Sequence, residues 1–423
     1  MGYSGARGGL DAIRAAEALV RRRRLTGESD WLGLDQITER LRLAVDRVQG
    51  EGGLWAPELA ARAFRQAEGD VLEAAQLLRA YRSTLPRLAY TVPVDADEMV
   101  LLRRIVPAYR TPPGPQLLGR TLDYTGRLID LTPEADARAE AHRDQARRAE
   151  DSADTGSQAS VDTAAPDSAA DEQVDHRRPP RLLELLRSLD LAVERRTGED
   201  PEPFDITRKP ARPGAPRSAW LAAMSRAETG ALMNLWYRNV LGPDGYIHEV
   251  TLGEVRHGYL PVRIAHPHTG GSVDIGTVRA TETEAIEDLD GLDEDRTKFD
   301  VGYGLCFGHN ERKAIAMANL DISAWRDRGR SALHQSILLT TDGLDSSGFL
   351  EHLKLPHYVT FRSMVERKRA VAAALAEMDR REAAQADVDG LLAEAPPEED
   401  CISSVSAGPG ADDPVSASTG GTP

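Results

Sequence analysis

The chain of 423 residues has little cysteine and no long apolar run. Its two cysteines, Cys306 and Cys401, provide neither a disulfide framework nor a CxxC motif, so we expect no intrinsic Fe–S cluster. No segment approaches the ~18 apolar residues that a membrane span requires. The N-terminus also lacks the apolar core of a signal peptide. We therefore expect a cytoplasmic protein that does not bind membranes.

Negative charge is abundant, but it is concentrated in two segments. The formal net charge is -16; residues 134–176 hold 12 acidic and 4 basic residues, and residues 377–423 hold 11 and 2. The rest of the chain is close to neutral. The acidity is therefore no argument against a phosphate-bearing substrate, and it is typical of solubilising disordered segments.

The first part of the chain is mainly helical in pattern. Apolar residues recur at three- and four-residue spacing over residues 11–24, 34–48, 56–69 and 70–85, with glycines between these segments. We expect a mainly helical N-terminal domain over residues 1–131.

A polar insertion follows this domain. Between Leu131 and Leu182 the only aliphatic side chains larger than alanine are Val161 and Val174. Such a segment cannot bury enough apolar area to offset the entropy of ordering. The sequence therefore predicts a disordered acidic insertion over residues 132–181.

The remaining chain mixes both patterns. Residues 181–196 and 218–239 are helical in period, while 258–266 and 272–286 read as strands around the turn PHTGG. We expect a mixed α+β domain over residues 182–365, then an exposed helix and a disordered acidic tail over 366–423. The predicted fold class is α+β: a helical N-terminal region, then a mixed α/β C-terminal domain, with a disordered insertion and tail.

The segment GYGLCFGHNERKAIAMANLD, residues 302–321, predicts a strand, a turn and a helix. Asn310 suits the N-cap position. Two cations then fall in the first helical turn, where the helix dipole disfavours them by ~0.3 to 1 kcal/mol each. Either they bind an anion together with backbone N–H groups, or both extend into solvent. The spacing fits neither a P-loop nor GxGxxG. The candidate substrate-binding residues are Gly302, Gly304, Gly308, His309, Asn310, Arg312 and Lys313.

The segment HLKLPHYVTF, residues 352–361, contains two histidines five positions apart. Neither a helix nor a strand brings His352 and His357 together, but the bend expected at Pro356 could do so. A zinc site usually needs about four ligands. The residues alone thus leave two interpretations, a partial metal site or two structural histidines.

Other features favour simpler interpretations. His266 and His268 fit an exposed hairpin tip better than a metal clip. The basic runs at 21–24 and 366–369 lack aromatic residues between the charges, so we expect solvated helix faces and no nucleic-acid binding. Asp46 and Arg47 lie on one predicted helix, as an internal ion pair or a substrate contact.

Several motifs together resemble one known family, the PhnI subunits of the bacterial carbon–phosphorus lyase complex. The resemblance covers roughly residues 3–131 and 182–361, and neither the insertion nor the tail has a recognised counterpart. The motifs are ARGGLDAI, LRLAVDRVQGEGGL, LLRAYRSTL, PGPQLLGRTLDYTGRLIDL, FDITR, GYGLCFGHNERKAIAMA and HLKLPHYVTF.

The resemblance implies an enzyme subunit of phosphonate catabolism. Family members take part, with PhnG, PhnH and PhnL, in replacing the purine of ATP by methylphosphonate, which gives ribose 1-methylphosphonate 5-triphosphate. Alone, they release the purine of ATP or GTP, and water takes the place of the alkylphosphonate. The implied alternative is a non-catalytic scaffold that supplies a metal-holding wall to the radical SAM subunit PhnJ.

The resemblance also bears on individual residues. In the family, the two histidines of the HLKLPHY motif hold a metal at the contact with PhnJ, which implies that His352 and His357 bind a divalent metal, with zinc as the expected ion. Independently of the resemblance, the two cations at the predicted helix start lead us to expect that charge reversal of Arg312 and Lys313 raises the KM for the nucleotide. Asp46 is the single catalytic candidate.

Overall fold

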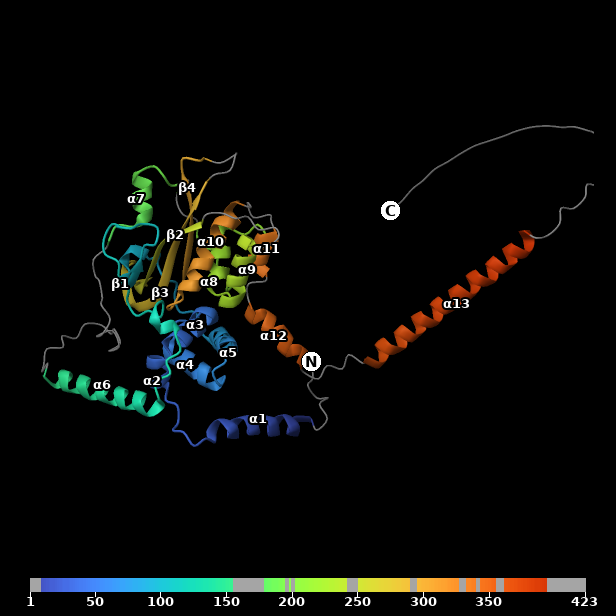
Figure 1. Cartoon of the computed structure of the whole chain (residues 1–423), viewed down its shortest axis with the longest axis horizontal. Helices are drawn as coiled ribbons and strands as arrows, with labels where there is room; N and C mark the ends of the chain where they lie inside the picture. Colours follow the sequence, from blue (N-terminus) through green and yellow to red (C-terminus); the bar gives the residue numbers. More distant parts are fainter. Residues whose placement is uncertain are drawn as a thin grey trace, which may run out of the picture. The chain divides into compact units, whose positions relative to one another are not determined.

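The computed structural model describes residues 9–154, 179–194, 198, 202–241, 250–289, 295–326, 332–339, 343–354 and 361–393. These residues form helices and one four-stranded sheet (Figure 1). The chain divides into two units, residues 1–355 and 356–423. Helices dominate the N-terminal region and the sheet follows, so the predicted α+β class is confirmed.

The N-terminal region contains α1 (Gly9–Leu25), α2 (Leu34–Arg40), α3 (Arg42–Gly52), α4 (Pro57–Gln66) and α5 (Val71–Thr84). Helices α2 to α5 share a core of buried side chains that includes Ile37, Val48 and Leu78. Helix α1 has no buried residue. The helix predicted over residues 34–48 is interrupted at Leu41, which separates α2 from α3. The compact helical core therefore begins at α2.

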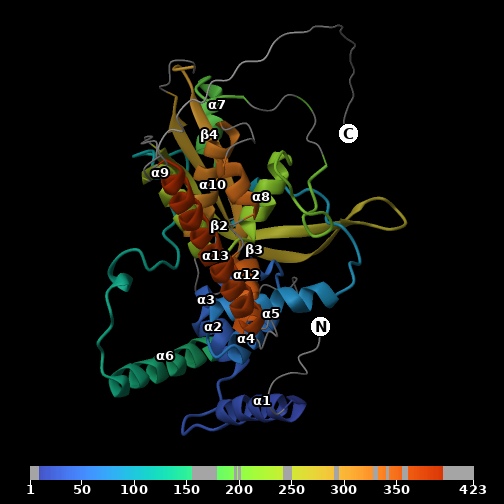
Figure 2. The same ribbon diagram turned by 90° about the vertical axis from the view of Figure 1, so that its right-hand side faces the viewer.

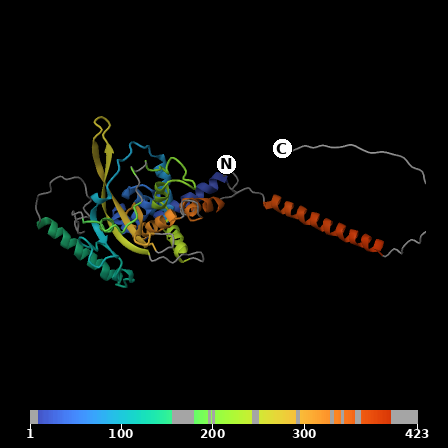
Figure 3. The ribbon, with the colours of Figure 1, turned by 90° about the horizontal axis from the view of Figure 1, so that it is seen from above.

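The sheet is antiparallel throughout and has the order β1–β2–β3–β4. Its strands are β1 (Val100–Ile105), β2 (Val250–Ala265), β3 (Ser272–Asp288) and β4 (Phe299–Phe307). The predicted hairpin is present, and the β2–β3 tip projects beyond the helices (Figures 2 and 3). Strand β1 comes from the region assigned to the helical domain, and its pairing with β2 joins that region to the sheet.

Helix α10 (Glu311–Arg326) packs on one face of the sheet, and two glycines of β4 allow its close approach. A Cβ atom on Gly302 would lie 1.9 Å from the carbonyl oxygen of Ala318. One on Gly304 would lie 2.2 Å from that of Ala314. Only glycine fits where another backbone comes this close. These two predicted substrate contacts are thus covered by α10 on that side.

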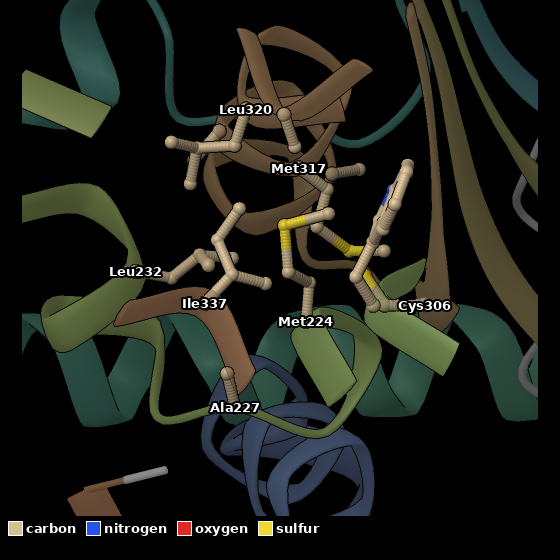
Figure 4. Packing of buried hydrophobic residues seen from close by; sticks show 11 residues of the cluster. Met224, Ala227, Leu232, Cys306, Met317, Leu320 and Ile337 are labelled. Atoms are coloured by element: carbon tan, nitrogen blue, oxygen red, sulfur yellow. The ribbon is translucent and has the colours of Figure 1, made fainter. Parts of the chain in front are cut away.

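An apolar cluster joins α10 to the surrounding helices α8 (Arg217–Ser225), α9 (Thr229–Leu241) and α11 (Ala332–Leu339). Met224 of α8, Leu232 of α9 and Ile337 of α11 are buried with Cys306 and Met317 (Figure 4). Burying side chains of this size contributes about 1.5 to 3 kcal/mol each. This cluster therefore fixes α10 and the C-terminal end of β4 relative to the helices.

The opposite face of the sheet carries buried charges. Arg181, just before α7 (Leu182–Ser188), donates from Nη1 to Glu284 Oε1 (2.6 Å) and from Nη2 to Glu282 Oε1 (2.9 Å). Arg256 of β2 also pairs with Glu282. Burial raises the pKa of Glu284 to about 7, against the lowering effect of Arg181. This face is therefore held by a buried ionic network rather than by apolar packing alone.

Part of the predicted disordered insertion is helical, which corrects that prediction. The described side chains of helix α6 (Glu134–Asp154) are almost all exposed. It contains no glycine or proline and is rich in alanine, arginine and glutamate, which favour helices without tertiary packing. Local helix propensity, and not apolar burial, accounts for the helix in this segment. Residues 155–178 lie outside the described part of the chain.

Two predicted helices are shorter than expected. The helix predicted over residues 181–196 ends at Ser188, and Asp190 adopts a positive φ of 54° just after it. The period over 218–239 divides into α8 and α9. Glu228 begins α9, because its carboxylate accepts hydrogen bonds from the backbone N–H groups of Gly230 and Ala231 at 2.8 and 2.6 Å.

The predicted exposed C-terminal helix is present as α13 (Phe361–Ala393). Its described side chains are nearly all exposed, and it belongs to the second unit of the chain. The predicted disordered tail from residue 394 onward lies outside the described residues.

Candidate functional site at the start of helix α10

Neighbouring strands bring polar side chains together near the start of α10. The sheet register aligns Arg103 of β1 with His257 of β2, and His257 with Thr281 of β3. Residues paired in this way project from the same face of a sheet. Thr281 shares its face with Ala285, which packs against α10, so all three lie on the side of the sheet that α10 covers.

The Asp46 carboxylate of α3 occupies the start of α10. Its Oδ2 accepts a hydrogen bond from the backbone N–H of His309 (3.0 Å), and its Oδ1 accepts one from Arg279 Nη2 (2.8 Å). Asp46 is fully buried. A negative charge is favourable at a helix start. The anion at this position is therefore a side chain of the protein itself.

The turn between β4 and α10 is held closely to the sheet. Thr281 Oγ1 accepts from the N–H of Asn310 (3.1 Å) and donates to the carbonyl of Gly308 (2.6 Å). Gly308 has a φ of +74°, and a Cβ atom there would lie 2.5 Å from the Cβ of Asp46. Both the backbone conformation and the proximity of Asp46 require glycine. The predicted strand, turn and helix over 302–321 are confirmed.

Two stacked imidazoles lie beside this turn, with ring centroids of His257 and His309 4.3 Å apart. His257 Nδ1 lies 3.0 Å from the carbonyl of Ala280, which only accepts, so Nδ1 carries the proton. His309 Nδ1 lies 2.7 Å from Arg42 Nη1, which only donates, so the proton is on Nε2. Burial, and then the positive charge of nearby groups, hold the pKa of His257 well below its usual value. The buried His257 ring is therefore held in its neutral form.

Glu311 connects the histidine pair to strand β1. Its Oε1 lies 3.5 Å from His309 Nε2 and accepts a hydrogen bond from Arg103 Nε (2.5 Å). Burial opposes ionisation, but the contacts with His309 and Arg103 lower the pKa of Glu311. Arg103 also pairs with Asp123. Glu311 is thus an ionised, largely buried carboxylate at the helix start.

The predicted substrate-binding residues do not converge. Arg312 is exposed, whereas the side chain of Lys313, one position later, is completely buried. Successive helical residues point about 100° apart, so two adjacent cations face different surroundings. The N–H of His309 binds Asp46, and the N–H of Asn310 binds Thr281. The two cations thus do not meet at one surface in this arrangement, and their contact with a phosphate stays a prediction.

Asp46 and Arg47 do not pair with each other. Asp46 binds Arg279, while Arg47 Nε and Nη2 lie 2.8 Å from Glu51 and 2.6 Å from Glu228. Both residues belong to internal ion pairs: Glu51 lies four positions after Arg47 in the same helix, whereas Glu228 and Arg279 are far away in the sequence. No motif or spacing points to Arg42 or Arg279. His257 is a lone histidine in the sequence, and Glu311 directly follows the predicted N-cap Asn310.

The predicted metal ligands are only partly described. His352 lies in α12 (Gly343–Lys354), its side chain is not described, and His357 lies outside the described residues. His266 and His268 lie at the hairpin tip, where His266 Nδ1 accepts from the backbone N–H of His268 (3.2 Å) and Thr269 (3.1 Å). Among the residues that the structure describes, no group of three or more His, Cys, Asp or Glu could hold a metal ion.

Two hollows lie elsewhere on the first unit. One, of about 640 Å³, lies between α1 and α4 and is lined by arginines that include Arg21, Arg23 and Arg24. Those arginines are exposed, as predicted, and α1 buries no side chain that would fix the hollow. The other, of about 320 Å³, lies along residues 305–307 at the end of β4, beside the loop 204–207. The second is smaller, and residues of α5, α8 and β4 line it.

Comparison with known proteins identifies the family. The model of the family described as bacterial phosphonate metabolism protein (PhnI) matches residues 2–374. The chain belongs to the PhnI family. This confirms the resemblance inferred from the motifs and makes the chain a PhnI-type subunit of the carbon–phosphorus lyase pathway.

The chain matches three relatives over nearly their whole length. Identity is 43% to HtxH of Stutzerimonas stutzeri, a protein whose name describes a C-P lyase subunit, over 87% of this chain and 95% of the relative. It is 38% to the PhnI subunit of alpha-D-ribose 1-methylphosphonate 5-triphosphate synthase of Escherichia coli K12, over 86% and 96%. It is 34% to the protein of the same name from Rhizobium meliloti, over 86% and 93%.

The family name implies a subunit of an assembly. Within the described residues, no helix combines the length and the apolar character needed to cross a bilayer.

Proposed function

We propose that this chain is a subunit of ribose 1-methylphosphonate 5-triphosphate synthase and takes part in displacing the purine of ATP by methylphosphonate. The observation that carries the proposal is the 38% and 34% identity, over 86% of this chain, to two proteins of that name. The proposed partners are PhnG, PhnH, PhnJ and PhnL. Without them, water replaces the phosphonate and the chain releases the purine of ATP or GTP.

The reaction sets three tasks. Displacement at C1' of the ribose passes through an oxocarbenium-like state, so the protein anchors the phosphates, stabilises positive charge at the sugar and assists the leaving base. An ionised carboxylate suits the second task, and Glu311 is one. Asp46 is engaged by the N–H of His309 and by Arg279. We assign Asp46 a positioning role, because it fixes the turn instead of facing a ligand.

Two substrates of this reaction carry negative charge, the nucleotide and the phosphonate. The proposed anion contact at the helix start is Arg312, whose side chain is exposed, unlike that of Lys313. Gly308, His309 and Asn310 shape the turn that precedes it. A single guanidinium can bind one phosphonate group through two parallel hydrogen bonds. Methylphosphonate is therefore the ligand proposed for Arg312.

A divalent metal, with zinc as the expected ion, is also part of the proposal. His352 and His357 would hold it at the contact with PhnJ, and a partner residue, phosphate or water would complete the ligand set. Changing either histidine to alanine should reduce the metal that the assembled complex retains while leaving the fold intact. Metal analysis of the purified complex tests this, and equal metal content in wild type and both variants would contradict it.

Purine release by the purified full chain tests the proposed activity. Incubation with ATP or GTP should yield free adenine or guanine, measured by chromatography. The alternative is a scaffold that supplies the metal-holding wall to PhnJ. One observation favours it: the hydrogen-bond donors at the turn are used internally, by Asp46 and Thr281. No purine release together with tight PhnJ binding would support the scaffold.

A further inference from the structure

The pocket at the end of β4 is lined by two arginines from different helices. Arg82 of α5 and Arg226, just after α8, both line it, and the electrostatic effects of Arg79 and Arg87 also act on Arg82. Among the described residues, Asp205 is the carboxylate that lines the pocket. The pocket therefore has an excess of positive charge.

Asp205 is already engaged by neighbouring groups. Its Oδ1 accepts a hydrogen bond from the N–H of Thr207 (2.9 Å), and its Oδ2 accepts one from Arg87 Nη1 (2.5 Å). Hydrogen bonding to Thr207, followed by the Arg87 contact, lowers the pKa of Asp205 to about 2. The Asp205 carboxylate therefore binds Arg87 and the N–H of Thr207, and it compensates the charge of Arg82 only weakly.

Arg82 is held in place by the end of α3. Its Nη1 donates to the carbonyl of Gly53 (3.1 Å), and a Cβ atom on Gly53 would lie 2.6 Å from that same Nη1. Gly53 has a left-handed φ of +65°, which favours glycine. The glycine-rich end of α3 thus makes room for the guanidinium and fixes it by one hydrogen bond.

The facing loop is also fixed. The N–H of Phe204 donates to Ser218 Oγ in α8 (3.1 Å), and Arg87 Nη2 donates to Thr207 Oγ1 (2.6 Å). Phe204, Ile206 and Phe307 give the pocket an apolar wall. A concave site with an apolar wall and a few convergent polar groups is typical of small-molecule binding.

Among the described residues, no carboxylate forms an ion pair with Arg82, whose guanidinium donates to the carbonyl of Gly53. Burial, and then the positive charges of Arg226, Arg79 and Arg87, lower the pKa of Arg82. A guanidinium that is partly buried among like charges costs free energy unless an anion joins it. This differs from Arg279, which has the Asp46 carboxylate at 2.8 Å.

We propose that this pocket binds the triphosphate of the nucleotide substrate, with Arg82 and Arg226 as direct contacts and the apolar wall beside the nucleoside. Several arginines match a chain of several phosphates, whereas one phosphonate needs only one guanidinium. The pocket volume of about 320 Å³ is large enough for a phosphate chain. The inference rests on the proposed function for the identity of the nucleotide, and it locates the triphosphate away from Arg312.

Calorimetric titration of the full chain with ATP, tripolyphosphate and methylphosphonate tests the pocket. Arg82→Gln should weaken ATP and tripolyphosphate binding to a similar extent, by roughly 10- to 100-fold, as expected for losing a hydrogen bond to a charged group. Arg62→Gln, on the exposed face of α4, removes the same charge and should change neither affinity.

A second pair of variants avoids the structural contact of Arg82. Ser225 lines the pocket, and its Oγ donates only to the carbonyl of Ala222 in its own helix (2.9 Å). Ser225→Asp places a negative charge in the pocket and should weaken the binding of ATP and tripolyphosphate. Ser225→Asn introduces an uncharged side chain of the same shape as aspartate and should leave both affinities unchanged. Thermal melting verifies that both variants fold.

The outcomes separate the pocket from the proposed function. Unchanged ATP and tripolyphosphate affinities in Arg82→Gln and Ser225→Asp would overturn the pocket, as would no tripolyphosphate binding by the unaltered chain. ATP binding that is lost in Ser225→Asp, without any purine release by wild type, would refute the nucleosidase activity and leave the pocket standing. Purine release with an unchanged KM for ATP in both variants would refute the pocket and support the nucleosidase activity.

Discussion

Two positively charged regions of this protein differ in what balances them. At the start of α10, Arg279 meets the Asp46 carboxylate and the turn N–H groups bind Asp46 and Thr281. At the end of β4, Arg82 lies among like charges, and the nearby carboxylate of Asp205 is bound by Arg87. Charge at a helix start is thus a weaker guide to an anion site than charge without an internal partner.

The difference follows from the cost of desolvation. A buried guanidinium is expensive unless a carboxylate or an external anion lies beside it. At the start of α10, the Asp46 carboxylate offsets the desolvation cost of Arg279 in the folded protein, so this ion pair contributes to stability. In the pocket at the end of β4, an anionic ligand would offset part of the desolvation cost of Arg82, so this region is suited to binding. The two regions should therefore respond oppositely to mutation, one in folding free energy and the other in affinity.

The largest effect is expected for Asp46→Ala, which tests the turn side of the comparison. Removing the carboxylate leaves Arg279 largely buried without its partner and frees the N–H of His309. Breaking a buried ion pair in this way costs about 3 to 5 kcal/mol of unfolding free energy. Urea denaturation measures it, with Ser225→Asn as a control expected within about 0.5 kcal/mol of wild type. A loss below about 1 kcal/mol would mean that the turn does not depend on this pair.

A smaller loss is expected for Gly304→Ala. The added Cβ would lie 2.2 Å from the carbonyl of Ala314, so α10 must shift, and overpacking of this kind costs about 1 to 3 kcal/mol. Gly390→Ala, in α13 with nothing within 4 Å, is the control and should be neutral or slightly stabilising. A raised KM for ATP without loss of stability would instead support the sequence-based interpretation of Gly304 as a substrate contact.

Glu284 belongs to the buried ionic network of the sheet, in which the nearby arginines do not fully offset the cost of burying its carboxylate. Its folded pKa of about 7 exceeds the ordinary value of 4.5, so the folded protein retains a proton that the unfolded chain releases. This contribution to stability is complete below pH 4.5 and declines as the pH rises through about 7. The slope is at most about 1.4 kcal/mol per pH unit.

Glu284→Gln should remove this decline. Unfolding free energies at several pH values between 5 and 8 measure it, with Asp288→Asn, an exposed position of the same strand, as the control. The dependence of unfolding free energy on pH should differ from that of wild type in Glu284→Gln and should equal it in Asp288→Asn. Equal pH slopes of unfolding free energy in wild type and Glu284→Gln would show that the carboxylate is ionised in the folded protein.

The smallest effect on stability is expected for Arg312→Glu, within about 0.5 kcal/mol, because the side chain is exposed. Its effect should be functional: in the reconstituted complex, the KM for methylphosphonate should rise about 10-fold or more, and the KM for ATP should stay constant. A selective rise in the KM for ATP would restore the helix start as the nucleotide contact and count against the pocket.

Local patterns predicted much of the secondary structure. The strand, turn and helix at 302–321, the β2–β3 hairpin and α13 were all evident from spacing, glycines and caps. Helix α6 was missed because apolar burial alone was considered. Strand β1 was missed because six residues within a helical region carry little periodic signal, and its pairing partner β2 lies about 150 residues away in the sequence.

The candidate site was less predictable than the fold. The proximity of Asp46 to Gly308, and of Arg82 to the loop 204–207, depends on contacts between segments that are far apart in the chain. No spacing rule links such residues. Lys313 illustrates the same point, because only the packing of α3 against β4 and α10 decides that this cation is buried while Arg312 is exposed.

The sequence by itself determined the family, the α+β class and the local elements, because motifs and periodicity are properties of neighbouring residues. Tertiary structure alone decided which charges are neutralised inside the protein and which remain for a ligand. The physical reason is that electrostatic and desolvation energies depend on distance and burial in space, and positions along the chain do not specify either.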